Sequence, residues 1–203
     1  MDPDLYEAAA SGDLNFLKRI DPKLDVFQVT KHQQNSVLHI AVKFKQLEFC
    51  RQILISSSPS LLLIKYNSKG ESALHVAAKI GCLEIAKLLV DWAKELCEDV
   101  ESWGVNTIRE LLRMVNLEKD TALHVAVRNG HFAVAKYLME TDQGLLDLVN
   151  DANVSPLCLA IDGGFFVIAS FILEMFPKSL DGDINIKTAL RSAVIHSQHG
   201  KFN

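Results

Sequence analysis

A four-residue motif, Leu-His-x-Ala, recurs along this chain of 203 residues and limits what the chain can fold into. Intact copies begin at Leu38, Leu74 and Leu123, and degenerate copies begin at Leu5, Leu157 and Leu190. Successive copies are 33, 36, 49, 34 and 33 residues apart. Self-similarity at such a period is typical of stacked repeats, in which no unit can bury its apolar face alone. We therefore expect one elongated stack.

Further residues recur around each motif and predict a pair of short helices. A Ser or Thr precedes the motif, where its hydroxyl can cap the first helix, at Ser36, Ser72, Thr121, Ser155 and Thr188. A helix-ending position, Gly in all copies but one, follows at Gly12, Lys45, Gly81, Gly130 and Gly164. Regularly spaced apolar residues then predict a second helix. The predicted fold class is all-α.

This pattern resembles the ankyrin repeat, whose signature is T-P-L-H-x-A on a period of 33 residues. The resemblance covers nearly the whole chain and implies a solenoid of stacked helix pairs with projecting hairpin loops. It also implies that each motif histidine bridges the backbones of adjacent units. The residues that carry the structural motif are Leu38, His39, Ala41, Leu74, His75, Ala77, Gly81, Leu123, His124, Ala126, Gly130, Leu157, Ala160 and Gly164.

We expect residues 1–203 to form a single domain. Its units are predicted near residues 1–30, 31–66, 67–115, 116–149 and 150–182, with an incomplete unit at 183–203. The last unit stops before a second helix can be completed. That ending favours a fragment of a longer protein over a natural short cap, and both interpretations stay open.

Two segments depart from the pattern. The 49-residue interval carries an insertion at about 91–114, with the preceding helix prolonged to about Glu101 and a short helix starting at Thr107. This insertion either covers neighbouring units or docks a partner. The stretch 163–172 is unusually apolar. Its surplus residues Phe165 and Phe171 either belong to the core or touch another domain or protomer.

Composition excludes several functional classes. With 21 basic and 25 acidic side chains the net charge is −4, which argues against a nucleic-acid partner. No stretch approaches 18 consecutive apolar residues, so no membrane span is expected in this chain. The acidic start leads into no apolar signal segment, and the four cysteines form no CxxC pair. We therefore expect a cytoplasmic chain with reduced thiols.

No catalytic, cofactor or metal site is predicted. The motif histidines lie far apart in successive units, and His196 with His199 lacks a third ligand. No nucleophile elbow, P-loop or HExxH motif is present, and Gly163-Gly164 is interpreted as a helix stop. We expect no enzyme and no small-molecule substrate. A weak alternative, an enzyme, would have to rely on Cys97 or His196.

The resemblance implies that a protein partner binds the inner helix face and the hairpin tips. The corresponding positions on the inner face are Lys43, Phe44, Lys79, Ile80, Arg128, Asn129 and Asp162. Those on the hairpins are Ser68, Lys69, Glu71, Glu118, Asp120 and Asp151. Lys43, Lys79 and Arg128 form a basic column, which either recognises an acidic protein segment or is merely solvated. We expect reversal of all three charges to abolish partner capture without lowering the melting temperature.

Residues 1–9, 111–116 and 120–131 resemble plant ankyrin proteins of the accelerated-cell-death type. Those relatives carry a C-terminal PGG domain with several membrane-spanning helices and act in defence and stress signalling, but nothing in this chain matches that domain. The expected function is a non-catalytic protein–protein interaction module in plant defence or stress signalling. The alternative is the cytosolic regulatory half of a multi-pass membrane protein, in which case the chain would lie at the cytosolic face of a membrane.

Overall fold

The computed structural model describes residues 1–19, 28–56, 59–98 and 107–175, and within these ranges its regular structure is helical. The first helices of successive units are α1 (Pro3–Ser11), α3 (Val37–Lys43), α6 (Ala73–Ile80), α9 (Ala122–Arg128) and α11 (Pro156–Asp162). The second helices are α2 (Leu14–Arg19), α4 (Leu47–Ser56), α7 (Leu83–Glu98), α10 (Phe132–Thr141) and α12 (Phe166–Met175). Three shorter elements follow second helices: α5 (Pro59–Leu63), α8 (Thr107–Arg113) and the 3₁₀ helix η1 (Gln143–Asp147). The all-α prediction is confirmed.

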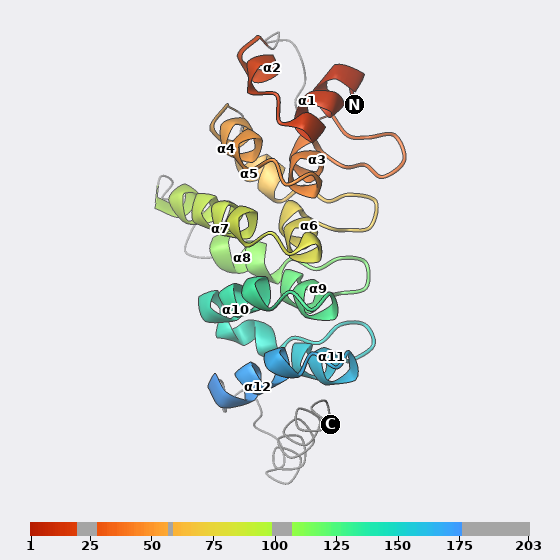
Figure 1. Cartoon of the computed structure of the whole chain (residues 1–203), viewed down its shortest axis with the longest axis vertical. Helices are drawn as coiled ribbons and strands as arrows, with labels where there is room; N and C mark the ends of the chain where they lie inside the picture. The colour runs from red at the N-terminus through yellow and green to blue at the C-terminus, as the bar shows by residue number, and fades with distance from the viewer. Residues whose placement is uncertain (20–27, 57–58, 99–106, 176–203) are drawn as a thin grey trace, which may run out of the picture.

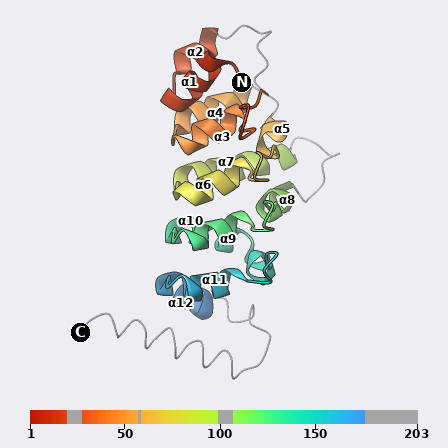
Figure 2. The ribbon, with the colours of Figure 1, turned by 90° about the vertical axis from the view of Figure 1, so that its right-hand side faces the viewer.

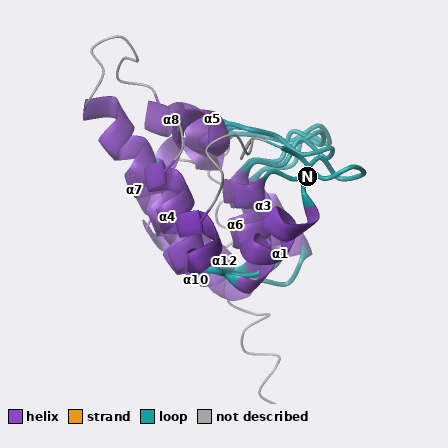
Figure 3. Cartoon of the chain, turned by 90° about the horizontal axis from the view of Figure 1, so that it is seen from above, coloured by secondary structure: helices purple, strands orange, loops and turns teal. Residues whose placement is uncertain are grey.

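The helices form two parallel rows along the long axis of the molecule (Figure 1). The first helices make one row, on the side from which the hairpin loops project, and the second helices make the other. We number the units 1 to 5 by their first helices α1, α3, α6, α9 and α11. Seen from the side, each unit is one layer of the stack (Figure 2). Seen from above, the hairpins lie over one another on one side (Figure 3).

The first helices begin and end where the sequence predicts. The hydroxyls of Ser36 and Thr121 each accept the backbone N–H of the histidine three residues on. Gly81 ends α6 in the left-handed region at φ 69°, and Lys45 takes the same conformation at φ 59°. Small alanines on these helices let neighbouring units approach closely, and Ala77 is fully buried.

The motif histidines join each unit to the next. The Nδ1 atom of His39 accepts the backbone N–H of Ser36, so Nε2 carries the proton and donates to the carbonyl of Glu71 in unit 3 at 2.8 Å. His75 repeats this arrangement and donates to the carbonyl of Asp120 in unit 4 at 3.0 Å. The predicted bridge between adjacent units is therefore present at these two histidines.

His124 departs from this arrangement. Its Nδ1 caps Thr121 in the same way, but its buried Nε2 has no hydrogen-bond partner among the described residues. The residue that corresponds in sequence to Glu71 and Asp120 is Val154, and no hydrogen bond of normal geometry joins its carbonyl to this Nε2.

A second link between units, not predicted from the sequence, involves the residue after the helix-ending position. Gln46 donates to the carbonyl of Ala10 at 2.9 Å, and His131 bonds the carbonyl of Lys79 at 3.0 Å. Each packs on the helix-ending glycine of the unit before, since a Cβ atom on Gly81 would lie 2.5 Å from the ring of His131. Gly at this position therefore serves close packing as well as backbone conformation.

Phe165 holds the same position in unit 5. A Cβ atom on Gly130 would lie 2.5 Å from its ring, so this phenylalanine covers the helix end of unit 4. Phe171 packs edge-on against Phe132, with ring centroids 5.5 Å apart. Phe165 and Phe171 are thus half-buried and pack against the core between units 4 and 5.

The short third elements carry buried leucine pairs at matching positions: Leu62–Leu63, Leu111–Leu112 and Leu145–Leu146. In each unit the second leucine of the pair precedes an Asn of the next hairpin by four residues. The leucine pair of α8 is thus a regular part of unit 3, and the residues that unit 3 has in excess lie before Leu111. The helix α7 extends to Glu98, and residues 99–106 lie outside the described ranges.

Other sequence expectations also fall outside the described ranges. These concern Gly104, the incomplete unit at 183–203, and the pair His196 and His199. No helix within the described ranges is both long and apolar enough to cross a membrane.

Because the buried motif histidines must stay neutral, the stack should lose stability on acidification. Burial lowers the pKa of His39, His75 and His124 below the ordinary value of 6.5. The unfolded chain therefore binds protons below about pH 6.5 that the folded chain does not, and the free energy of unfolding falls by up to about 1.4 kcal/mol per pH unit for each histidine. Urea denaturation between pH 7.5 and 5 measures this slope.

The matched control is His75→Gln, which removes one titrating group. The variant should be less stable at neutral pH and show a shallower slope between pH 6.5 and 5. A wild-type stability that is flat across this interval would contradict the prediction. Carboxylates such as Asp142, whose pKa is lowered by its hydrogen bonds from Arg113, lose their contribution only at lower pH.

Candidate functional site

The hairpins that lead into α6, α9 and α11 are each shaped by one asparagine. The side-chain oxygens of Asn67, Asn116 and Asn150 each accept the backbone N–H groups two and four residues further on. Three residues after each asparagine the chain turns in the left-handed region, at Gly70, Lys119 and Asn153. This asparagine was not predicted as a shared position, although it lies five residues before Ser72, Thr121 and Ser155.

Successive hairpins are joined through their backbones. Ser68 donates its N–H to the carbonyl of Gln33 at 2.9 Å, Leu117 to that of Lys69 at 3.1 Å, and Asp151 to that of Glu118 at 3.0 Å. The side chains of Lys119 and Asp151 add an ion pair at 2.6 Å between units 4 and 5. The hairpins therefore form a continuous wall along the inner helix row, and we call the surface between this wall and the first helices the concave face.

The basic column is largely neutralised within its own units. Lys79 pairs with Glu71 at 2.9 Å, and Arg128 pairs with Asp120 at 2.5 Å. Both acids stand immediately before the capping Ser or Thr and both bases eight residues later. Burial raises the pKa of Glu71, but hydrogen bonds from Asn67 and Lys79 outweigh it, so the pKa is lowered and the carboxylate stays charged.

Lys43 differs from the other two members of the column. The position equivalent to Glu71 and Asp120 is occupied in unit 2 by Asn35, an uncharged residue. The described residues give Lys43 no carboxylate partner, and its ammonium lies 5.7 Å from the ring centroid of Phe44. Lys43 is therefore the member of the basic column whose positive charge remains uncompensated.

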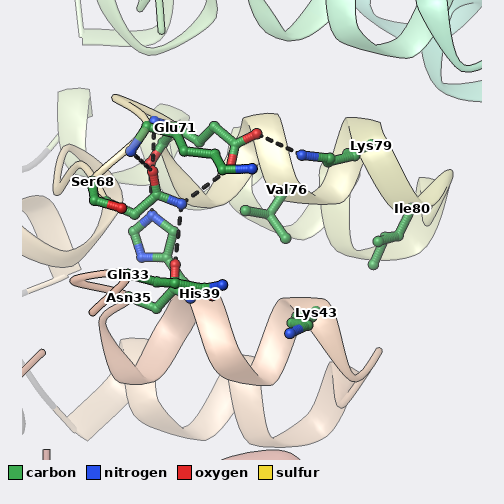
Figure 4. A pocket seen from close by; sticks show the side chains of 11 residues that line it. Gln33, Asn35, His39, Lys43, Ser68, Glu71, Val76, Lys79 and Ile80 are labelled. Carbon is green, nitrogen blue, oxygen red and sulfur yellow. Dashed lines mark hydrogen bonds and ion pairs between the residues drawn. The ribbon is translucent and has the colours of Figure 1, made fainter. Parts of the chain in front are cut away.

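A groove of about 290 Å³ lies between units 2 and 3 on the concave face. Of the residues predicted to bind a partner, the groove brings together Lys43, Ser68, Lys69, Glu71, Lys79 and Ile80. Lys79 and Ile80 of α6 lie on one side, and Lys43 of α3 lies on the other (Figure 4). Gln33, Asn35, His39, Asn67 and Val76 complete the lining. Val76 and Asn67 were missed, because an apolar motif residue and a turn residue carry no functional signal in the sequence.

The remaining predicted residues lie elsewhere on the same face. Asp162 is exposed near the end of α11, and Glu118 is exposed on its hairpin. Asn129 donates to the carbonyl of Val125 in its own helix at 2.8 Å. Phe44 is 44% exposed beside Lys43. The predicted residues are therefore distributed along the concave face, and the groove gathers those of units 2 and 3.

The described residues contain no cluster of three or more His, Cys, Asp or Glu that could hold a metal ion. Burial raises the pKa of the Cys50 thiol to about 12, so this cysteine is protonated at neutral pH and is no nucleophile. Cys97 and His196, the candidates of the weak catalytic alternative, lie where the structure describes no side chains.

The paired bases change the expected result of the triple charge reversal. Asp120 is 1% exposed and also accepts the side-chain amide of Asn150 at 2.8 Å. A Glu at position 128 would set a second negative charge against this buried carboxylate. The melting temperature should therefore fall, contrary to the expectation from sequence, and a variant that tests binding alone must leave Lys79 and Arg128 in place.

The pairing predicts unequal effects for two charge-removing substitutions in the basic column. Arg128→Leu leaves the Asp120 carboxylate without its cation and should lower the free energy of unfolding by about 1–3 kcal/mol. Lys43→Gln removes an exposed, unpaired charge and should change it by less than about 0.5 kcal/mol. Urea denaturation followed by circular dichroism compares them, and equal losses would show that the ion pair contributes nothing.

Comparison with known proteins agrees with this architecture. Residues 5–102 match the family description "Ankyrin repeats (3 copies)", and residues 118–151 match "Ankyrin repeat". The chain is 25% identical over 190 residues to "Protein ACCELERATED CELL DEATH 6" of Arabidopsis thaliana, covering 91% of this chain and 28% of that protein.

Two further relatives come from animals and fungi. One is "Transient receptor potential cation channel subfamily A member 1 homolog" of Caenorhabditis elegans, 28% identical over 87% of this chain and 13% of that protein. The other is "Glycerophosphocholine phosphodiesterase gde1" of Schizosaccharomyces pombe, 26% identical over 80% of this chain and 14% of that protein. The chain thus spans less than a third of each relative. With the helix pairs, the hairpin wall and both family matches in agreement, the chain belongs to the ankyrin-repeat family.

Proposed function

We propose that this chain is a non-catalytic protein-interaction module that holds a segment of a partner protein along its concave face. The observation that carries the proposal is the groove between units 2 and 3, where a partly apolar surface lies beside the uncompensated charge of Lys43. Backbone hydrogen bonds between hairpins fix one wall of this face before any partner arrives. A preformed wall reduces the ordering cost of binding.

The dimensions favour a protein segment over a small molecule. Pockets for small ligands typically hold about 300–1,000 Å³ and enclose most of the ligand. The groove holds about 290 Å³ and opens onto the concave face, so it suits one or two side chains of a longer partner. Further contacts along the face, at Asn129, Asp162 and the exposed hairpin residues, would extend the interface to a stable size.

The proposed setting is plant defence or stress signalling. It rests on the likeness to "Protein ACCELERATED CELL DEATH 6", which extends over 91% of this chain. The proposed location is the cytoplasm, or the cytosolic face of a membrane if the chain is part of a longer protein.

Site-specific photocrosslinking in plant cells tests where a partner binds. A photoreactive residue replacing Phe44 or Ser68, both exposed on the concave side, should crosslink the same partner protein. The same probe replacing Lys87 on α7 or Val167 on α12, both exposed on second helices, should give at most background. Mass spectrometry of the crosslinked bands compares the four variants. Crosslinks confined to the second-helix positions would contradict the proposal.

A second candidate function is the regulatory part of a multi-pass membrane protein. It is favoured by the short coverage of the relatives, 28% of the plant protein and 13% of the protein named as a cation channel homolog. In this role the concave face would sense a cytosolic partner and transmit its presence to a membrane domain encoded further along.

The transcript that encodes this chain tests the second candidate. An open reading frame continuing past Asn203 into several apolar segments of about 20 residues is the expected result. Sequencing of full-length transcripts from the source tissue gives the reading frame. A stop codon directly after Asn203 in every transcript would rule this candidate out and leave the interaction module unaffected.

A further inference from the structure

We propose that the groove between units 2 and 3 is a subsite for one acidic side chain, Asp or Glu, of the partner segment, with an apolar partner residue next to it. This inference rests on the proposed function and names the chemistry of its central contact. It depends on three features of the groove: the balance of charges that line it, the fixed position of its one carboxylate, and its apolar side.

The groove is positive although the chain is negative. Three lysines line it, Lys43, Lys69 and Lys79, against one carboxylate, Glu71. His39 also lines it and adds no charge at neutral pH, because burial lowers its pKa. The whole chain has a net charge of −4, so this local excess of positive charge is set against the overall balance. A complementary partner residue is therefore anionic.

The charge excess belongs to this groove and not to the rest of the basic column. In unit 4, Arg128 is matched by Asp120, and in unit 5 the equivalent position is the acid Asp162. Further along the concave face an acidic partner side chain would meet a neutral pair and then a like charge. The groove at Lys43 is thus the place along the first helices where an acidic side chain is best accommodated.

The position of Glu71 makes Lys43 the primary contact. Glu71 is held by Asn67 Nδ2 at 3.0 Å and by Lys79 at 2.9 Å, so it cannot swing away from the groove (Figure 4). An incoming anion must therefore compete with Glu71 for the ammonium group of Lys79, whereas no carboxylate competes for that of Lys43. Glu71 also repels the incoming anion and limits affinity. A single carboxylate tolerates this arrangement better than a group of higher negative charge.

The apolar side of the groove selects the neighbouring partner residue. Val76 and Ile80 line the groove from α6, and Phe44 is exposed next to Lys43. These side chains would be covered by an aliphatic or aromatic partner residue adjacent to the acid, and their burial would add to the charge contact. The volume of about 290 Å³ leaves room for these two side chains.

Selection from a phage-displayed library of random peptides on the purified chain tests the inference. Recovered peptides should be enriched in Asp or Glu beside an apolar residue. Fluorescence anisotropy with the recovered peptides should show Lys43→Gln weakening binding about fivefold. Lys87→Gln, an equal charge change on an exposed second-helix lysine, should leave binding unchanged.

Glu71→Gln gives the sharper test, because it should strengthen binding several-fold. Gln keeps one acceptor oxygen, which can serve either Asn67 or Lys79 but not both, and it removes the repelling charge. If Glu71 served only to shape the hairpin, this substitution would weaken binding or leave it unchanged. Thermal denaturation of each variant confirms that the fold is kept.

The outcomes separate this inference from the proposed function. Peptides that bind but show no acidic enrichment and no response to Lys43→Gln would overturn the subsite and leave the interaction module standing. Displacement of the peptides by millimolar inorganic phosphate as effectively as by an acidic competitor peptide would also overturn it, because the apolar contact would then contribute nothing. If no peptide is enriched over a blank surface, both proposals fall.

Discussion

The neutral histidine that joins one unit to the next is the interaction on which the stack depends. Its Nδ1 accepts from the capping Ser or Thr of its own unit, and its Nε2 donates to the hairpin of the following unit. The bridge of His39 ends on the carbonyl of Glu71, the residue whose side chain then pairs with Lys79. The same contact that holds units 2 and 3 together therefore also positions the acid of the groove. The His39 ring thus contributes both to the stability of the stack and to the charge pattern of the groove.

The bridge weakens towards the C-terminal end of the described ranges. His124 has a buried Nε2 without a partner there, and a buried polar atom left unsatisfied costs about 1–3 kcal/mol. In unit 5 the motif histidine is replaced by Cys158, which is exposed. Apolar packing also holds unit 5 against unit 4, because Phe165 covers Gly130 and Phe171 packs against Phe132. Unit 5 thus lacks the histidine bridge but keeps three polar links to unit 4: the hairpin hydrogen bond of Asp151, its ion pair with Lys119, and the bond from Asn150 to Asp120.

Most of the fold could be predicted from the sequence because it depends on local rules repeated at fixed spacing. Caps at Ser36 and Thr121 and the left-handed turn at Gly81 need only neighbouring residues. The charge of the concave face could not be predicted in the same way. The pairing of Lys79 with Glu71 joins a hairpin to a helix across eight residues, and whether it forms is decided by side-chain geometry. The sequence does contain a signal for this ion pair, since acid and base recur at the same two positions in units 3 and 4. The signal can be interpreted only once the hairpin is known to fold back over the helix.

Those two positions explain how a constant scaffold acquires a particular charge pattern. The residue before the capping Ser or Thr and the residue eight positions later are Asn35 and Lys43, then Glu71 and Lys79, then Asp120 and Arg128, then Val154 and Asp162. Their combined charge is positive in unit 2, neutral in units 3 and 4, and negative in unit 5. The histidine bridges of units 2 and 3 end on backbone carbonyls at these positions, so the side-chain charge can vary there, provided that a buried acid such as Asp120 changes together with its basic partner. Because the sign changes along the face, the proposed partner segment would bind in one direction, with its acidic end over unit 2 and a basic end beside Asp162.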